Sequence, residues 1–101
     1  MTVPRQSEKQ FQETVVQFAK LHGWLVFHAF DSRRSEPGWP DLALCRPPRL
    51  VLAELKSDRG FLSPRQKQWL AALGECTNLE MGVWRPSDWP HIEATLGRRA
   101  A

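Results

Sequence analysis

The sequence predicts a single α/β domain in which a mixed four-stranded sheet is flanked by helices, in the order αβββαβα. Three observations predict this class. An apolar stripe at helical spacing opens the chain, three short apolar runs follow, the first of them rich in β-branched and aromatic residues, and a second helix start separates them from a fourth run. The chain of 101 residues is 42% apolar, which suits one core, so we expect one domain over 1–101.

The first helix is expected over residues 7–22. Ser7 provides an N-cap, Gln10 follows at the spacing of a capping box, and Gly23 ends the segment. Apolar side chains recur at helical spacing at Phe11, Val15, Phe18 and Ala19. The next run, 24–30 (WLVFHAF), is dense in branched and aromatic residues and predicts a buried strand.

Two further strands follow a polar loop at 31–37. They are expected over 41–45 and 50–56, separated by a turn at 46–49 (RPPR), because proline is not accommodated inside a paired strand. The second of these strands is apolar on both faces up to its last positions. We therefore expect it to be buried within the sheet.

A second helix is expected after a loop at 57–62. Ser63 provides the N-cap, Pro64 occupies the first helical position, and Gly74 ends the helix after about Leu73.

The chain should close with one strand and one helix. The strand is expected over 79–84, and Ser87 or Asp88 should cap a helix that ends near Leu96. Residues 97–101 are expected to form a frayed tail.

Asp41 and Glu54 are the residues most informative about function. Asp41 follows the tight turn Gly38-Trp39-Pro40 at the start of one strand, and Glu54 lies near the end of the next. If the two strands pair as a hairpin, the two carboxylates lie close together. Alternate residues of a strand share a face, so Lys56 accompanies Glu54. The alternative is that Glu54 and Lys56 form a simple ion pair at the solvent edge of the strand.

Two carboxylates and a lysine in this arrangement suit metal-assisted hydrolysis of a phosphodiester. Clustered carboxylates raise each other's pKa unless a cation neutralises them. Mg²⁺ does so with oxygen ligands from one or two carboxylates, a backbone carbonyl and waters. The metal activates water and stabilises charge on phosphoryl oxygens, while Lys56 can steady the attacking water or the pentacovalent phosphorane.

A third acid is expected from the first helix, where Glu8 and Glu13 compete. At roughly 100° per residue, Glu8 lies in the apolar stripe, whereas Glu13 is rotated about 140° away towards solvent. Glu8 is therefore preferred, and Gln12 lies near the same stripe, where it can orient a water. An alternative for Glu8 is an acid favoured in the first turn by the helix dipole.

These residues resemble the PD-(D/E)XK nuclease superfamily and, more narrowly, its VRR-NUC branch, the small nuclease domains of phages, bacteria and some eukaryotic DNA-repair proteins. The resemblance runs through most of the chain and implies a restriction-endonuclease-like fold. It is carried by Ser7-Glu8 with Gln12, by Gly38-Trp39-Pro40-Asp41, by Glu54-Leu55-Lys56, and by Leu62-Ser63-Pro64-Arg65-Gln66.

The resemblance implies a role for each matching position. Asp41 and Glu54 would bind the metal, and Leu55 would contribute its backbone carbonyl. Lys56 would be the catalytic lysine and Gln66 a supporting active-site residue. Read from the residues alone, Gln66 is equally an ordinary first-turn helix residue with its side chain in water.

The charge of the chain fits a polyanionic partner. The net charge is +3, from 14 lysines and arginines against 11 acids, and the remaining surface is more positive once three acids are assigned to a metal. The candidate phosphate contacts, which lie in loops or at helix starts near the proposed site, are Arg33, Arg34, Arg59, Arg65 and Lys67.

The leading hypothesis is a Mg²⁺- or Mn²⁺-dependent endonuclease that hydrolyses DNA, with branched or structured DNA implied by the resemblance. Junction cleavage needs two symmetric cuts, and a chain with one site supplies them most economically as a C2 homodimer. The alternatives are a nucleic-acid-binding module that does not cleave and a nuclease subunit that requires a partner. The chain contains no base-recognition motif that would fix a preferred DNA sequence.

Composition favours a cytoplasmic protein that acts without a membrane or a small-molecule cofactor. No apolar run approaches the roughly 18–20 residues that span a bilayer, and residues 1–12 are polar, unlike a signal peptide. Cys45 and Cys76 lack any metal-ligand spacing, so we expect reduced, packed thiols.

Overall fold

The computed structural model describes residues 6–29 and 36–98. Within these ranges the order αβββαβα is confirmed, with a short 3₁₀ turn before the last helix. The elements are α1 (Glu8–Leu21), β1 (Leu25–His28), β2 (Leu42–Arg46), β3 (Arg49–Leu55), α2 (Pro64–Gly74), β4 (Glu80–Trp84), η1 (Pro86–Asp88) and α3 (Trp89–Gly97). Arg33 and Arg34, two of the predicted phosphate contacts, lie outside the described residues.

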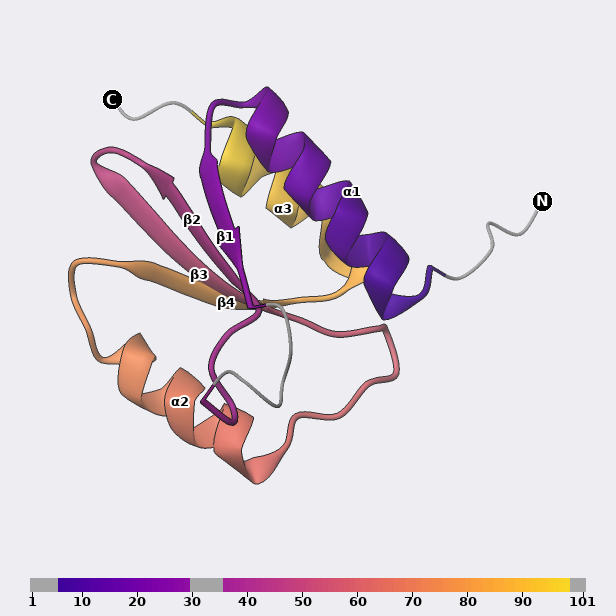
Figure 1. The fold of residues 1–101 in the computed structure, drawn as a ribbon, viewed down its shortest axis with the longest axis vertical. Coiled ribbons are helices and arrows are strands. Elements are labelled where there is room, and N and C mark those ends of the chain that lie inside the picture. The colour runs from indigo at the N-terminus through magenta and orange to yellow at the C-terminus, as the bar shows by residue number, and fades with distance from the viewer. Residues whose placement is uncertain (1–5, 30–35, 99–101) are drawn as a thin grey trace.

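The strands form one mixed sheet in the order β1-β2-β3-β4. The pairs β1–β2 and β2–β3 are antiparallel, and β4 runs parallel to β3. Helices α1 and α3 cover one face of the sheet and α2 packs on the other (Figure 1). Because Leu42 pairs with Ala53 in the β2–β3 hairpin, Asp41 is level with Glu54 at the end where β3 finishes.

The two serine N-caps predicted from the sequence are confirmed. The Ser7 hydroxyl accepts a hydrogen bond from the Gln10 amide at 3.1 Å, and the Gln10 side chain accepts one from the Ser7 amide at 3.0 Å. Ser63 and Gln66 form the same reciprocal pair at the start of α2, where Pro64 is the first helical residue. Both capping boxes satisfy amides that the first helical turn leaves without partners.

Two other helix boundaries differ from expectation. Gly74 is the last residue of α2 instead of a terminator beyond it, and Glu75 occupies the C-cap in a right-handed conformation. The Asp88 side chain does not cap α3, because it accepts a hydrogen bond from the Arg85 amide at 2.9 Å and so closes η1.

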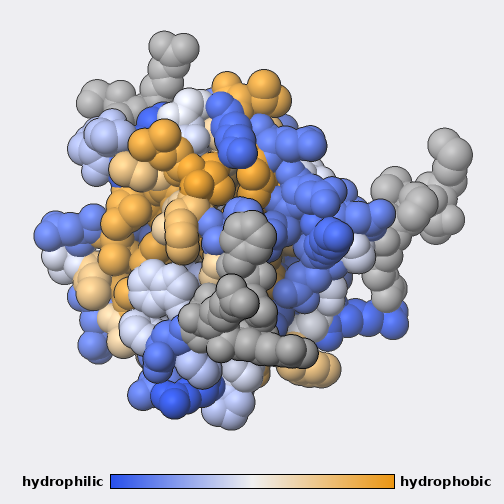
Figure 2. All heavy atoms as spheres, in the orientation of Figure 1, coloured by the Kyte–Doolittle hydropathy of each residue, from blue (hydrophilic) through white to orange (hydrophobic). Residues whose placement is uncertain are grey.

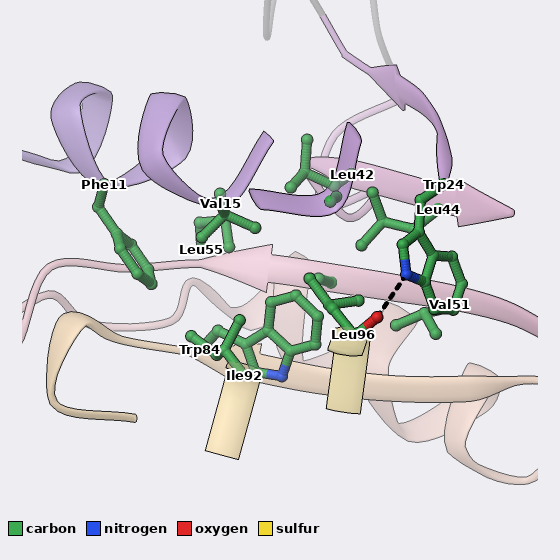
Figure 3. Close-up of a cluster of buried hydrophobic side chains, with 12 residues drawn as sticks. Phe11, Val15, Trp24, Leu42, Leu44, Val51, Leu55, Trp84, Ile92 and Leu96 are labelled. Carbon is green, nitrogen blue, oxygen red and sulfur yellow. Dashed lines mark hydrogen bonds between the residues drawn. The ribbon is translucent and has the colours of Figure 1, made fainter. Parts of the chain in front are cut away.

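The core lies between the sheet and the layer formed by α1 and α3 (Figure 3). The predicted stripe of α1 enters it, with Phe11, Val15 and Ala19 fully buried. The Trp24 indole nitrogen donates a 2.8 Å hydrogen bond to the Leu96 carbonyl, which ties the start of β1 to the end of α3. The cluster is completed by Leu42, Leu44, Val51, Ala53, Leu55, Trp84 and Ile92.

Strand β1 is an edge strand, so the prediction of a buried strand over 24–30 is wrong. Leu25 and Phe27 are 72% and 64% exposed, whereas Val26, which points to the opposite face, packs against the core. The cause is the position of α2, which packs on β4 at the far side of the sheet and leaves the same face open over β1. The run is apolar at nearly every position, so it carried no alternation to reveal the open face.

The structure bears on two further expectations, the packed cysteine thiols and the absence of a membrane span. Both cysteines are free, but only Cys45 is partly buried; Cys76 is exposed, so the expectation of a packed thiol is wrong there. In the part of the chain that the structure describes, none of the helices is long and apolar enough to cross a membrane.

Candidate active site

The turn that leads to Asp41 rests on helix α2. Gly38 has a φ of +88°, and a Cβ there would lie 2.5 Å from the carbonyl carbon and oxygen of Arg65, so only glycine fits. Trp39 packs edge-to-face on Trp69 with ring centroids 5.2 Å apart, and the Trp69 indole donates a 3.1 Å hydrogen bond to the carbonyl of the residue before Gly38. These contacts fix where the chain enters β2.

Asp41 is tied to both neighbouring strands. Its backbone carbonyl accepts a hydrogen bond from the Ala29 amide at 3.0 Å, just past the end of β1. Its carboxylate oxygen Oδ2 accepts one from the Leu55 amide at 2.8 Å. The carboxylate is therefore held against the last residue of β3, beside Glu54.

Glu54 is the one buried charged side chain among the described residues, with 1% of its surface exposed. Its Oε1 accepts a 3.2 Å hydrogen bond from Nε2 of Gln66. Its Oε2 is the one buried side-chain oxygen or nitrogen in the described part of the chain that has no hydrogen-bond partner. A buried carboxylate oxygen without a partner is costly, and a bound cation would satisfy it.

The pKa of Glu54 is raised from 4.5 to about 9. Burial is the largest cause, followed by the hydrogen bond and the negative charge of Asp41, and Glu8 adds a smaller effect of the same sign. The charge of Lys56 acts in the opposite direction. Because two carboxylates this close cannot both ionise without compensation, the pair either retains a proton or takes up a cation in its place.

A divalent cation fits the pair, although the set of carboxylates is smaller than predicted. Among residues 6–29 and 36–98, no three side chains of the His, Cys, Asp or Glu type lie close enough to hold a metal. Two carboxylates suffice for Mg²⁺, which keeps several waters and uses one or two carboxylates. The unpartnered Oε2 of Glu54 beside the Asp41 carboxylate is the observation that favours the fit.

Of the two acids that competed on α1, Glu8 acts on this pair. It is exposed in the first turn of the helix, and its charge contributes to the raised pKa of Glu54. Glu13 instead lines a surface hollow with Lys9, Gln12 and His28, among other residues, and none of the carboxylate pair lines that hollow. Glu8 thus acts on Glu54 through its charge, but it does not form a three-residue metal-binding group with Asp41 and Glu54.

Lys56 directly follows β3. Its amide donates a 3.0 Å hydrogen bond to the Trp84 carbonyl, which extends the pairing with β4 by one residue. Its side chain is only partly buried, and its positive charge partly offsets the rise in the pKa of Glu54. The expected proximity of Lys56 and Glu54 is therefore observed.

Gln66 has two roles at once. Its side-chain oxygen accepts a 2.8 Å hydrogen bond from the Ser63 amide, and its side-chain nitrogen donates a 3.2 Å hydrogen bond to Oε1 of Glu54. The interpretation of Gln66 as a residue with its side chain in water is wrong, because both ends of the amide have protein partners. The capping box thus aims a donor at the buried carboxylate.

Arg85 supports the site and was missed by reasoning from the sequence. Its Nη1 donates 2.7 Å hydrogen bonds to the carbonyls of Ser57 and Gly60, in the loop that follows Lys56. The Ser87 amide also donates to the Asp58 side chain at 3.0 Å. The signal that could have revealed this is the parallel pairing of β3 and β4, which brings the segments after both strands to the same edge of the sheet.

The remaining predicted phosphate contacts are exposed on segments that adjoin the carboxylate pair. Arg59 lies in the loop after Lys56, and Arg65 and Lys67 flank Gln66 in the first turns of α2. These positions leave their charged groups available to solvent and to a ligand.

A mixed sheet with helices on both faces, with an aspartate at the start of one central strand beside a glutamate and a lysine at the end of the next, defines the PD-(D/E)XK class of nuclease-like domains. The chain belongs to the VRR-NUC family of this class, because the family model described as the VRR-NUC domain matches residues 1–87. Its function is accordingly nuclease-like.

A solved structure described as a VRR_NUC domain protein has the same fold. It aligns with a TM-score of 0.68 over 93% of this chain and 93% of that chain, at 19% sequence identity. No curated protein matches the chain significantly.

Proposed function

We propose that this protein is a metal-dependent endonuclease that hydrolyses DNA phosphodiester bonds. The observation that carries the proposal is the buried Glu54 carboxylate, which has an unpartnered oxygen and adjoins Asp41 and the charge of Lys56. A structural role does not account for it, since a buried carboxylate without full pairing lowers stability.

Asp41 and Glu54 would hold a Mg²⁺ or Mn²⁺ ion, with the backbone carbonyl of Leu55 as a third oxygen ligand. When bound, such an ion supplies an activated water and stabilises negative charge on the phosphoryl oxygens. The Leu55 amide keeps the Asp41 carboxylate in place, and Gln66 does the same for one oxygen of Glu54. The other oxygen of Glu54 stays free for the ion.

Lys56 is the residue of the chain that would act on the reacting phosphate. Its backbone is fixed by the hydrogen bond to Trp84, while its side chain remains partly open to solvent, where a substrate arrives. An ammonium group there stabilises charge that grows on the phosphoryl group in the transition state, and it can hold the attacking water by a hydrogen bond.

DNA is the substrate that a nuclease domain of this family implies, and the charges of the chain agree with it. Arg59, Arg65 and Lys67 surround the proposed site and carry positive charge that can position a phosphate backbone. We extend the proposal to branched or otherwise structured DNA, as repair and recombination require.

A second copy is the most economical way to make two symmetric cuts in branched DNA, and one surface suits it. Leu25 lies in a row with Cys45 and Leu50, and Phe27 lies beside Ala43 in the next row, on the face that α2 leaves open. We call these residues the open sheet face. Apolar residues gather over the strands in Figure 2. None of the five is charged, so two copies can meet there without repulsion.

The dimer is tested by measuring molecular mass in solution. Sedimentation of the wild type is expected to give a dimer, and Phe27→Glu a monomer, because a charge would be buried against an apolar surface. Ala94→Glu, on the exposed side of α3, is the matched control and should leave the mass unchanged. A monomeric wild type at micromolar concentration contradicts the dimer and leaves the single-site nuclease intact.

Two alternatives remain to be compared with the proposal. A binding module without cleavage gains nothing from Asp41 and Glu54, because carboxylates repel the phosphates it would bind. A subunit that needs a partner protein keeps the same site, so only activity separates it from a stand-alone enzyme.

The first experiment measures cleavage of four-way-junction, flap, single-stranded and plain duplex DNA by the purified chain in Mg²⁺, Mn²⁺ or EDTA. Metal-dependent cutting by the wild type and by Lys20→Ala, but not by Lys56→Ala, is expected. Lys20 is a suitable control because it is an exposed lysine in the last turn of α1. Binding without any cutting contradicts a stand-alone nuclease, and equal cutting by Lys56→Ala contradicts the assigned role of that lysine.

A further inference from the structure

Phe61 is the most exposed of the large hydrophobic side chains in the described part of the chain, at 91%. It lies in the loop between Lys56 and the capping box of α2, and so between two groups of the proposed active site. An isolated exposed hydrophobic residue is ordinary on a protein surface, so its surroundings decide whether it has a role.

The loop that displays Phe61 is held in place by the body of the protein. The two hydrogen bonds from Arg85 reach the carbonyls of Ser57 and Gly60, and the Gly60 amide donates to the Ser57 carbonyl at 3.1 Å to close a turn. Phe61 immediately follows this fixed turn. Its exposure is therefore a feature of an anchored loop, in which the side chain is presented to solvent at a defined place.

The backbone just before Phe61 also lies close to Lys56, the proposed catalytic lysine. A Cβ placed on Gly60 would lie 3.3 Å from Cδ of Lys56 and 3.1 Å from the Ser57 hydroxyl oxygen, so this turn packs directly on the lysine side chain. The next Cα is about 3.8 Å further along the chain. Phe61 therefore directly follows a turn that contacts the Lys56 side chain, which places it next to the position proposed for the scissile phosphate.

Two tryptophans that could also stack on a base, Trp39 and Trp89, already pack against other aromatic rings of the protein. Trp39 packs against Trp69 with ring centroids 5.2 Å apart, and Trp89 packs against Phe18 at the same separation. Phe61 thus offers an unpaired aromatic face beside the site, and the exposed Arg59 two positions earlier supplies a cation for a neighbouring phosphate.

We propose that Phe61 stacks on an unpaired nucleobase next to the scissile phosphate, so that the protein favours DNA that has an unstacked base at that point over plain duplex. The inference deepens the proposed function and rests on it for the position of the scissile phosphate. Aromatic side chains stack on any base, which gives a preference for DNA structure without a preference for sequence. Plain duplex keeps its bases stacked on each other and offers no free face.

The test measures binding in EDTA, so that it does not depend on cleavage. The probe is a flap DNA with 2-aminopurine at the first unpaired position, and the variants are Phe61→Ala, Phe61→Leu and Phe61→Trp. Leucine keeps the apolar bulk without the aromatic face, and tryptophan keeps the face. Leu21→Ala, which removes another exposed apolar side chain at 83% exposure, is the matched control.

The wild type and Phe61→Trp are expected to change the 2-aminopurine fluorescence on binding, and Phe61→Ala and Phe61→Leu to lose that change. Their Kd for the flap should rise about 5- to 150-fold, and their Kd for plain duplex should stay the same. Thermal melting of each variant checks that the fold is intact.

Three results overturn the inference. The first is flap binding by Phe61→Leu equal to that of the wild type, and the second is an equal loss of flap and duplex binding. The third is a change in the oligomeric state of Phe61→Ala in solution, which would assign the side chain to contact with a second copy. A wild type that binds the flap through Phe61 but does not cleave it in Mg²⁺ or Mn²⁺ contradicts the proposed function and leaves the stacking contact standing.

Discussion

The two faces of the sheet differ in what they bury. Towards α1 and α3 the buried side chains form an apolar cluster, and the buried Trp24 indole donates its hydrogen bond to the Leu96 carbonyl. Towards α2, β3 buries Glu54, whose Oε2 has no partner. The first face supplies stability, and the second keeps a group that is unfavourable in the isolated protein and that the proposed cation would neutralise.

The largest effect is expected from Asp41→Asn on cleavage. The asparagine oxygen can still accept the Leu55 amide, but the side chain loses the charge that the metal site needs. We expect DNA cleavage to fall by about 10²- to 10⁴-fold, a loss typical of removing one electrostatic element of an active site. The measurement is single-turnover cleavage in Mg²⁺, and an active variant would remove Asp41 from the ligand set.

Phe11→Ala tests the apolar face. Phe11 is the first residue of the α1 stripe and is fully buried, so its removal leaves a cavity beneath the helix. The free energy of unfolding should fall by about 3–5 kcal/mol, measured by urea denaturation at pH 7. A loss below about 1 kcal/mol would mean that this face does not carry the stability assigned to it.

Glu54→Gln tests the polar face, and it should raise the free energy of unfolding where Phe11→Ala lowers it. The amide keeps an oxygen for Gln66 and does not titrate, whereas the wild-type carboxyl must take up a proton on folding near pH 8, because its pKa in the folded protein is about 9. We therefore expect the metal-free variant to gain about 1–3 kcal/mol of unfolding free energy at that pH. The variant should lose cleavage and any stabilisation by Mg²⁺. A variant less stable than the wild type in EDTA would contradict this account of the site.

The pH dependence of the unfolding free energy of the wild type and of Glu54→Gln gives a sharper test. The pKa of Glu54 is about 9 in the folded protein and near 4.5 when unperturbed, so the native state binds the extra proton between these values. The metal-free wild type should therefore lose stability as the pH rises through this window. Glu54→Gln should be flatter over the same range, as measured by urea denaturation in EDTA at several pH values.

The smallest effect is expected at an ion pair on the sheet edge. Arg49 donates two 2.7 Å hydrogen bonds to Glu80, and this contact is the first cause of the lowered pKa of Glu80. The Glu80 side chain is 40% exposed, so Glu80→Gln should cost no more than about 1 kcal/mol at pH 7. Because the pKa is lowered in the folded state, the difference between variant and wild type should vanish as the pH falls through it.

Local signals accounted for most of the fold and for the chemical core of the site. Ser7, Ser63 and the stripe from Phe11 to Ala19 act within a few residues of themselves, so the sequence revealed the helices they begin or bury. The hairpin that aligns Asp41 with Glu54 followed from two short strands and a turn between them.

The parts that could not be predicted depend on contacts between distant segments. Whether Leu25 is covered depends on where α2 comes to rest, which no pattern within 24–30 encodes. Arg85 holds the loop after Lys56 only because β4 returns parallel to β3. The position of Glu8 is of the same kind: it acts on Glu54 without forming a group of three acids among the described residues, because the distance from α1 to the end of β3 is a property of the packed domain.

The amide of Gln66 links the start of α2 to the buried carboxylate, and this has a consequence for protein engineering. Anyone transplanting the site to another scaffold must move the segment 63–66 together with Glu54, because the serine that begins the helix also orients the amide. Conversely, a change at Ser63, which touches neither carboxylate, would alter the strength of the proposed cation binding without replacing Asp41 or Glu54.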